Sequence, residues 1–238
     1  MRKNWQKVVA LWLVAFSLTA VSCIAHIHGN GKVVKVERSV SGFDKIAVST
    51  GIEVVLNQDT FEKVVVEADE NIQKIIKTEV SGGKLNIYLE EGVNYAKRMK
   101  VYVTLKKLEE LDASSGSEVK SEGKINIESL RVHSSSGSEV KIEVNGNFVD
   151  ADSNSGSELA ISGNSVSVKA DSSSGSELHA GKLIAEKGEA SASSGSELEL
   201  NVTKEIKAHA SSGASITVHG NPAIRDTESS SGGDVDIK

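Results

Sequence analysis

The stretch "SSSGSELHAG" at residues 172–181 contains a phrase that recurs along the second half of the chain. Close copies begin at residues 114, 135, 154, 173 and 193, and two degenerate copies begin at residues 211 and 230. The central glycines, which lie 18 to 21 residues apart, are Gly116, Gly137, Gly156, Gly175, Gly195, Gly213 and Gly232. Repetition at a steady period of this length is typical of stacked repeat architectures.

Apolar and polar residues alternate on both sides of each glycine. A flexible Ser/Gly-rich linker has no such alternation, so the pattern predicts strands with one buried face. The apolar or small residues five positions before the glycine are Leu111, Val132, Ala151, Ala170, Ala190 and Ala208, with Thr227 in the last copy. Each copy also has an apolar residue three positions after the glycine: Val119, Val140, Leu159, Leu178, Leu198, Ile216 and Val235.

A unit of about 19 residues cannot bury such a face alone, whereas stacked copies can. We therefore predict an all-β fold: a right-handed parallel β-helix (β-solenoid) of about seven 19–20-residue coils over residues 111–238. The glycine should supply a positive φ at a tight corner. The serines on either side of it should point inward and bond to their copies one coil away, about 4.8 Å along the rod.

The section before the repeats, residues 36–110, is also rich in strand-like alternation. One exception is "DENIQKIIKTEV" at residues 69–80, where the isoleucine spacing predicts a helix with Asp69 as its cap. We expect this section to cover one end of the rod, because an uncovered sheet edge invites association.

The first residues combine a basic start with an apolar run from Val8 to Val21, which predicts a signal peptide over residues 1–22. Cys23 follows directly in a context similar to a lipoprotein lipobox, so we expect lipidation at Cys23 and a tether over residues 23–35. The alternative is an ordinary cleavage site with an unrelated cysteine. Since Cys23 is the single cysteine, no internal disulfide can form.

Three segments together resemble a known family: "SGFDKIAVSTGIEVVLNQ" at residues 41–58, "VEADENIQKIIKTEVSGGKLNI" at residues 66–87, and the iterated "ASSGSEV" phrase. They look like the auto-transporter adhesin head, GIN domain family of bacterial envelope proteins. The resemblance covers residues 36–238. It implies an all-β, solenoid-like structure and an exported location, and the family pattern includes no catalytic residues.

The glutamates two positions after each glycine are the candidate binding face: Glu118, Glu139, Glu158, Glu177 and Glu197. Stacked coils would place these carboxylates in one outward column, where like charges repel. Solvated rotamers, neighbouring cations such as Lys120 and Lys141, or a bound calcium ion are the ways in which this repulsion could be relieved. His179 and His219 occupy different repeat positions, so we expect no two-histidine site.

No recognised catalytic motif is present, so we expect no catalytic residue, cofactor or resident metal. The formal net charge of −6 argues against nucleic acid as a partner. We therefore predict an exported, lipid-anchored protein of the cell envelope, at the outer membrane or cell surface, that binds an unknown surface ligand such as a glycan or a protein. The alternatives are an envelope scaffold without a soluble ligand, a carbohydrate-active enzyme and an ice-binding surface.

Overall fold

The computed structural model describes residues 27–238, and this part of the chain is all-β. It contains no helix of the length and apolarity that a membrane crossing requires. The signal peptide, Cys23 and the start of the expected tether lie outside the described residues.

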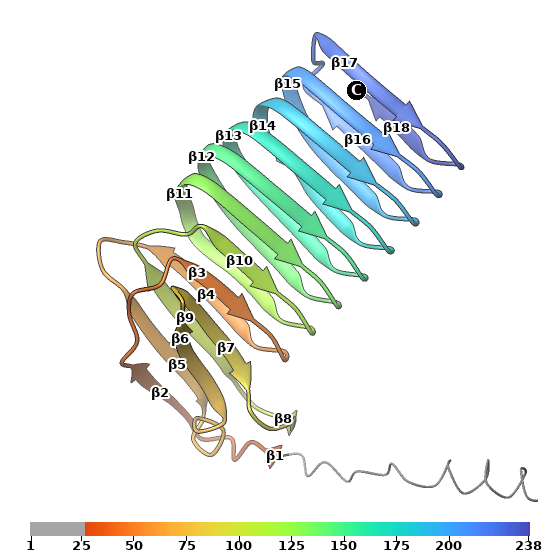
Figure 1. Ribbon diagram of the computed structural model, residues 1–238. Helices are drawn as coiled ribbons and strands as arrows, with labels where there is room; N and C mark the ends of the chain where they lie inside the picture. Colours follow the sequence, from red (N-terminus) through yellow and green to blue (C-terminus); the bar gives the residue numbers. More distant parts are fainter. Residues whose placement is uncertain (1–26) are drawn as a thin grey trace, which may run out of the picture.

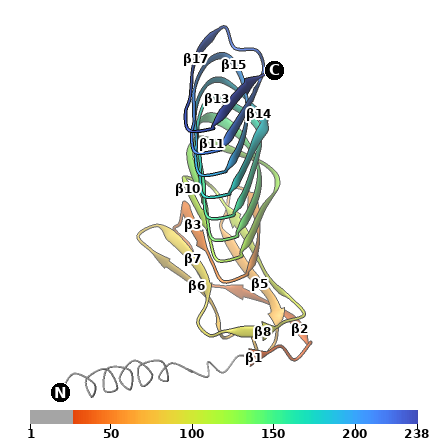
Figure 2. The same cartoon turned by 90° about the vertical axis from the view of Figure 1, so that its right-hand side faces the viewer.

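Five long strands form the centre of the molecule (Figure 1; Figure 2). Each runs along one side of the rod, bends, and returns along the other side, and each pairs in parallel with the next. They are β11 (Glu118–Ser134), β12 (Glu139–Ser153), β13 (Glu158–Ser172), β14 (Glu177–Ala192) and β15 (Glu197–Ala210). The structure thus confirms a β-solenoid of about seven turns with a spacing of about 19 residues, and the chain winds right-handed from its N-terminal to its C-terminal end (Figure 1).

The rod has two faces. One is named the glutamate face for its column of glutamates, and the other is named the ladder face for a column in which acidic and basic residues alternate. The glutamate face consists of the first halves of the long strands together with β4 (Glu53–Gln58), β9 (Met99–Leu105), β16 (Ser215–His219) and β18 (Asp234–Ile237). The ladder face consists of their second halves together with β3 (Lys45–Val48), β7 (Lys84–Leu89), β10 (Glu110–Ala113) and β17 (Ile224–Ser229).

Part of the stack lies earlier in the chain than the recurring phrase. β3 and β4 flank the residues Thr50 and Gly51, and they pair in register with β10 and β11, so that Ile46 lies beside Leu111 and Val54 beside Val119. The parallel stack therefore reaches into the stretch that the sequence analysis assigns to the N-terminal section.

The corners between the two faces are tight turns with two consecutive positive φ angles. In the first recurring phrase φ is 55° at Ser115 and 69° at Gly116, and the Ser117 amide donates to the Ser114 carbonyl at 3.2 Å. These are the features of a type I′ turn. The glycine prediction is confirmed, and every corresponding serine from Ser115 to Ser231 shares the left-handed conformation.

The expected inward direction of both serines is wrong for the one before the glycine. Ser115 is exposed while Ser117 is buried, because two left-handed residues in succession break the alternation of a strand. The expected bond from each serine to its own copy is also wrong. The Ser157 hydroxyl lies 2.7 Å from the Ser134 carbonyl of the preceding coil and 3.0 Å from the Ser153 hydroxyl of its own coil.

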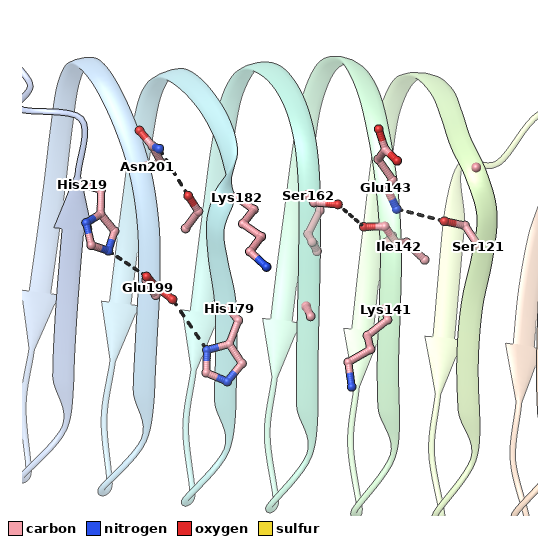
Figure 3. A pocket seen from close by; sticks show the side chains of 14 residues that line it. Ser121, Lys141, Ile142, Glu143, Ser162, His179, Lys182, Glu199, Asn201 and His219 are labelled. Carbon is pink, nitrogen blue, oxygen red and sulfur yellow. Dashed lines mark hydrogen bonds and ion pairs between the residues drawn. The ribbon is translucent and has the colours of Figure 1, made fainter.

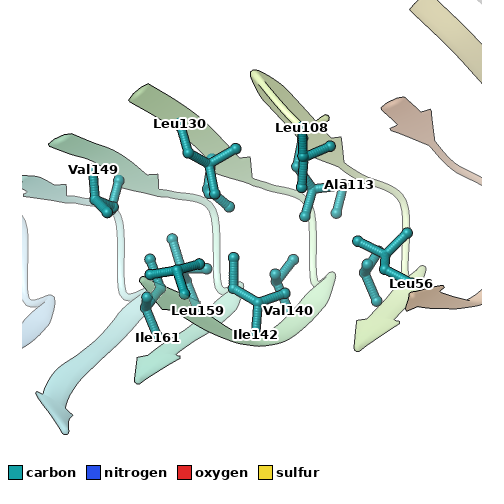
Figure 4. Packing of buried hydrophobic residues seen from close by; sticks show 14 of the residues in the cluster. Leu56, Leu108, Ala113, Leu130, Val140, Ile142, Val149, Leu159 and Ile161 are labelled. Atoms are coloured by element: carbon teal, nitrogen blue, oxygen red, sulfur yellow. The ribbon is translucent and has the colours of Figure 1, made fainter. Parts of the chain in front are cut away.

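The core is a narrow column of aliphatic side chains between the two faces (Figure 4). The residues predicted to point inward are buried through most of the stack: Leu111, Val132, Ala151, Val140 and Leu159 are all fully enclosed. The small alanines on the ladder face suit a narrow coil, in which the buried side chains of the two faces pack against each other.

Antiparallel strands end the parallel stack on its N-terminal side. β5 (Lys63–Asp69) pairs with β9 and with β2 (Val33–Arg38), and β6 (Ile76–Ser81) pairs with β7. β1 (Ile27–His28) pairs with β8 (Val93–Tyr95). The tether predicted to extend to residue 35 is therefore wrong for residues 33–35, which belong to β2 because their backbone groups pair with residues 67–69.

The helix predicted over residues 69–80 is also wrong. Residues 70–75 form turns, in which the Ile76 amide donates to the Ile72 carbonyl at 3.3 Å, and β6 begins at Ile76. Asp69 caps no helix, since its carboxylate accepts from the backbone amides of Gly31 and Lys97. The isoleucines are buried as the spacing suggests, but tertiary strand pairing overrides the helical pattern.

We predict that the buried corner hydroxyls stabilise the stack. Replacing Ser157 by alanine should lower the free energy of unfolding by about 1 kcal/mol, because the hydroxyl that bridges two coils is lost. Urea unfolding followed by circular dichroism measures this loss. The matched control is Ser155→Gly in the same turn, which should be neutral or stabilising because glycine adopts a positive φ without strain. Equal unfolding midpoints for Ser157→Ala and the parent would contradict the role assigned to the hydroxyl.

Candidate functional site

The five predicted glutamates lie in one column on the glutamate face. They are adjacent in register from strand to strand, from Glu118 through Glu139, Glu158 and Glu177 to Glu197. The side chains point to solvent: from Glu118 to Glu177 the exposed fraction ranges from 41% for Glu139 to 56% for Glu177, and Glu197 is also exposed. The fold therefore gathers the predicted residues into one linear array.

Neighbouring cations relieve part of the repulsion in this column. Lys141 pairs with Glu139 and lies 3.5 Å from Glu158, so it bridges two coils. The carboxylate of Glu139 raises the pKa of Lys141. The His179 Nε2 atom lies 3.1 Å from a Glu177 carboxylate oxygen, which is hydrogen-bond distance. Among the described residues Glu197 has no ion-pair partner, and the compensation is therefore incomplete toward the C-terminal end.

The column extends by one glutamate that the sequence analysis missed. Glu53 lies beside Glu118 in register, and Lys100 lies on its other side. The Glu53 carboxylate is 2.6 Å from the Lys100 amine and 2.7 Å from the Lys120 amine. Burial by itself raises the pKa of Glu53, but the hydrogen bonds from the two lysines outweigh burial and lower it. The signal for this residue is its place two positions after Gly51.

Charges on the opposite face follow a different rule. Along the ladder face one column alternates in sign through seven neighbouring strands: Glu110, Arg131, Asp150, Lys169, Glu189, Lys207 and Asp226. Within it the Arg131 guanidinium lies 3.1 Å from the Asp150 carboxylate. Since both faces have the same strand spacing, the fold itself does not impose the like-charge column of the glutamate face.

A groove lies beside the glutamate column on the same face (Figure 3). Its volume is about 820 Å³, and it crosses the coils from Ser121 to His219. The hollow exists because the residues at its centre are small, namely Ala160, Ser162 and Gly181, whereas longer side chains stand at both ends.

Hydrogen bonds to neighbouring coils fix the groove lining. The Ser121 hydroxyl accepts from the Glu143 amide at 2.9 Å, and the Asn201 side chain donates to the Gly181 carbonyl at 3.2 Å (Figure 3). A Cβ added to Gly181 would meet the Glu199 carboxylate at 2.5 Å, so glycine leaves room for that side chain over the groove floor.

Two histidines from different repeat positions, His179 and His219, lie near one carboxylate. His219 Nε2 is 2.7 Å from Glu199 Oε1, and His179 Nδ1 is 3.8 Å from Glu199 Oε2 (Figure 3). The two rings share one carboxylate partner, an arrangement that does not amount to a metal site within residues 27–238. His179 lies four residues after its glycine and His219 lies six residues after its own, and these two positions are neighbours on the same face. Comparing only residues at the same repeat position does not reveal such contacts between different positions.

No group of three or more His, Cys, Asp or Glu side chains within residues 27–238 is placed to hold a metal ion. The groove offers amines, imidazoles, carboxylates and amides, which can donate and accept hydrogen bonds across several coils.

These features define a β-solenoid repeat protein with one acidic, grooved face. The chain belongs to the family described as "Putative auto-transporter adhesin, head GIN domain", which it matches over residues 42–222. The family resemblance noted from the sequence is confirmed. Membership of an adhesin family indicates an exported or surface protein.

Solved structures share the fold. A putative adhesin from Bacteroides fragilis superposes with a TM-score of 0.84 at 21% identity, covering 89% of this chain and 100% of that one. A putative adhesin from Parabacteroides distasonis gives a TM-score of 0.74 at 19% identity, with 90% and 100% coverage.

A protein from Parabacteroides distasonis described as a putative lipid binding protein gives a TM-score of 0.71 at 19% identity, with 89% and 99% coverage. At these identities the likeness shows the fold alone. None of the curated proteins compared with the chain matches it.

We predict that Glu53 ties the first coil to its neighbours in a pH-dependent way. A carboxylate whose pKa is lowered by folding stabilises the protein above its unfolded pKa, and this contribution is lost as the pH falls through the folded pKa. Glu53→Gln should therefore lower the free energy of unfolding by about 1 kcal/mol at neutral pH. The difference from the parent should shrink below about pH 4.

The measurement is urea unfolding at a series of pH values. Glu118→Gln is the matched control, because Glu118 is 49% exposed and lies 3.9 Å from Lys120. Its effect should stay within about 0.5 kcal/mol of zero. A Glu53→Gln effect that is independent of pH would rule out the carboxylate charge as its cause.

Proposed function

We propose that the protein is displayed on the bacterial cell envelope and binds a glycan or protein ligand along its glutamate face, without catalysis. The observation that carries this proposal is the groove beside the glutamate column. The opposite face alternates its charges, whereas this face repeats one charge next to a hollow lined by donors and acceptors. Such a surface suits a ligand that extends over several coils.

The repeated geometry supports multivalent contact. Each coil presents a carboxylate at the same position, from Glu118 to Glu197, so a ligand with a matching repeat meets the same weak contact several times. Linked weak contacts raise the overall affinity without any single strong one. Lys141, His179 and His219 add cationic or neutral donors on the groove side of the column.

Binding is tested on an array of glycans and extracellular-matrix proteins. The decisive variants alter the floor of the groove. Ala160→Trp should fill the hollow and reduce binding at least tenfold, since the ligand loses the space it occupies. Glu139, Glu158 and Glu177 changed together to glutamine should also weaken binding. Both are measured as retained signal on the array.

The control is Ser191→Trp, which adds the same bulk to the ladder face and should leave binding unchanged. A parent protein that binds nothing on the array would favour the alternative of an envelope scaffold. Binding that Ala160→Trp retains at the parent's level would place the ligand outside the groove.

Attachment to the membrane is proposed to depend on Cys23. A signal peptide over residues 1–22 would direct export, and lipid chains on the Cys23 thiol would hold the rod at the outer membrane or cell surface. Burial of acyl chains contributes about 0.8 kcal/mol per methylene, so two or more chains anchor a protein stably.

We predict that Cys23→Ser moves the protein from the membrane fraction to the soluble fraction in detergent phase partition. The substitution removes the only thiol in the chain and leaves the solenoid sequence intact. Ser22→Ala is the neighbouring control and should partition with the parent. Retention of the Cys23→Ser protein in the membrane fraction would exclude the lipid anchor at this residue.

A further inference from the structure

Phe148 is an isolated aromatic residue on the ladder face. It is the only aromatic residue from position 111 onward, and it is half-buried on β12. Its neighbours in register are Ser129 on β11 and Ser167 on β13. Because both neighbours are small, the ring stands above them along the rod, and the space on either side of it is open.

Two hollows meet at this ring. One, of about 410 Å³, reaches from Phe148 past Ser129 toward the N-terminal end. The other, of about 300 Å³, reaches past Ser167 toward the C-terminal end. Since Phe148 lines both hollows, it divides one extended depression into two halves.

The charges around the depression balance one another. The Arg131 guanidinium pairs with Asp150 at 3.1 Å in the first hollow, and the Lys187 amine pairs with Glu205 at 3.1 Å in the second. The column between them alternates in sign through Lys169. Such a lining offers donors and acceptors without a net field, so it favours an uncharged, hydroxyl-rich ligand over a polyanion or a polycation.

We propose that Phe148 and its two hollows form a binding site for a neutral glycan. One pyranose ring stacks its C–H face on the Phe148 ring, and the sugar residues on either side occupy the hollows. Their hydroxyls bond to Asp150 and Arg131 on one side and to Lys169 on the other. An aromatic ring buries a large apolar area against a bound molecule, and aromatic residues are enriched among the side chains that contribute most to binding at interfaces. This site is on the face opposite the groove and goes beyond the function proposed for it.

The test titrates cellohexaose, maltohexaose and chitohexaose separately into the purified full chain and follows backbone amide shifts by NMR. At least one of them should shift the amides of Ser129, Phe148 and Ser167. Phe148→Leu keeps an apolar side chain but removes the aromatic face, so the Kd should rise at least tenfold. Phe148→Trp enlarges that face and should bind as well as the parent or more tightly.

Phe61→Leu is the matched control and should leave the Kd unchanged, because Phe61 is an exposed aromatic residue outside the groove and outside both hollows. The proposal is overturned if none of the three sugars shifts the amides around Phe148, or if Phe148→Leu binds as the parent does. Binding that is abolished by Ala160→Trp but not by Phe148→Leu would place the sugar in the groove. That result would support the function proposed for the glutamate face while rejecting this second site.

Discussion

Parallel, in-register hydrogen bonding between successive coils is the constraint on which the rest of the structure depends. A coil of about 19 residues can satisfy its backbone groups only through the coils before and after it. Each position therefore lies about 4.8 Å from the equivalent positions in the neighbouring coils, so the side chains at equivalent positions contact one another along the rod. Aliphatic columns such as Val140 beside Leu159 gain from this repetition. Buried corner serines such as Ser157 find carbonyl partners because the preceding coil supplies one at the same height.

Charged columns respond to the same constraint in two opposite ways. The ladder face alternates acid and base, so each ionised group is flanked by opposite charges, as Asp150 is by Arg131 and Lys169. The glutamate face repeats carboxylates and depends on lateral cations such as Lys120 and Lys141. Repulsion between like charges that the ladder face avoids is therefore tolerated on the glutamate face, and the two faces present different charge patterns on the same strand spacing.

Much of the solenoid could be predicted from the recurring phrase, because its period gives the coil and its alternation gives the buried columns. The conformation of the corners could not be predicted, because the inward–outward alternation of a strand stops where Ser115 and Gly116 are both left-handed. The helix expected after Asp69 failed because strand pairing of Ile76 decides the local structure. Within the site, the glutamate column followed from register, but contacts between columns, such as Glu199 with His219, depend on side-chain length and direction.

The alternating ladder also limits how such a rod can change in length. Each coil contacts only its neighbours, so duplication of a coil would extend the stack by about 4.8 Å without disturbing the ends. A single added coil, however, would set two like charges side by side, for example a second cation next to Lys169. Adding two coils restores the alternation. Duplications and deletions in multiples of two coils, about 40 residues, are therefore the ones that this face accommodates without electrostatic frustration.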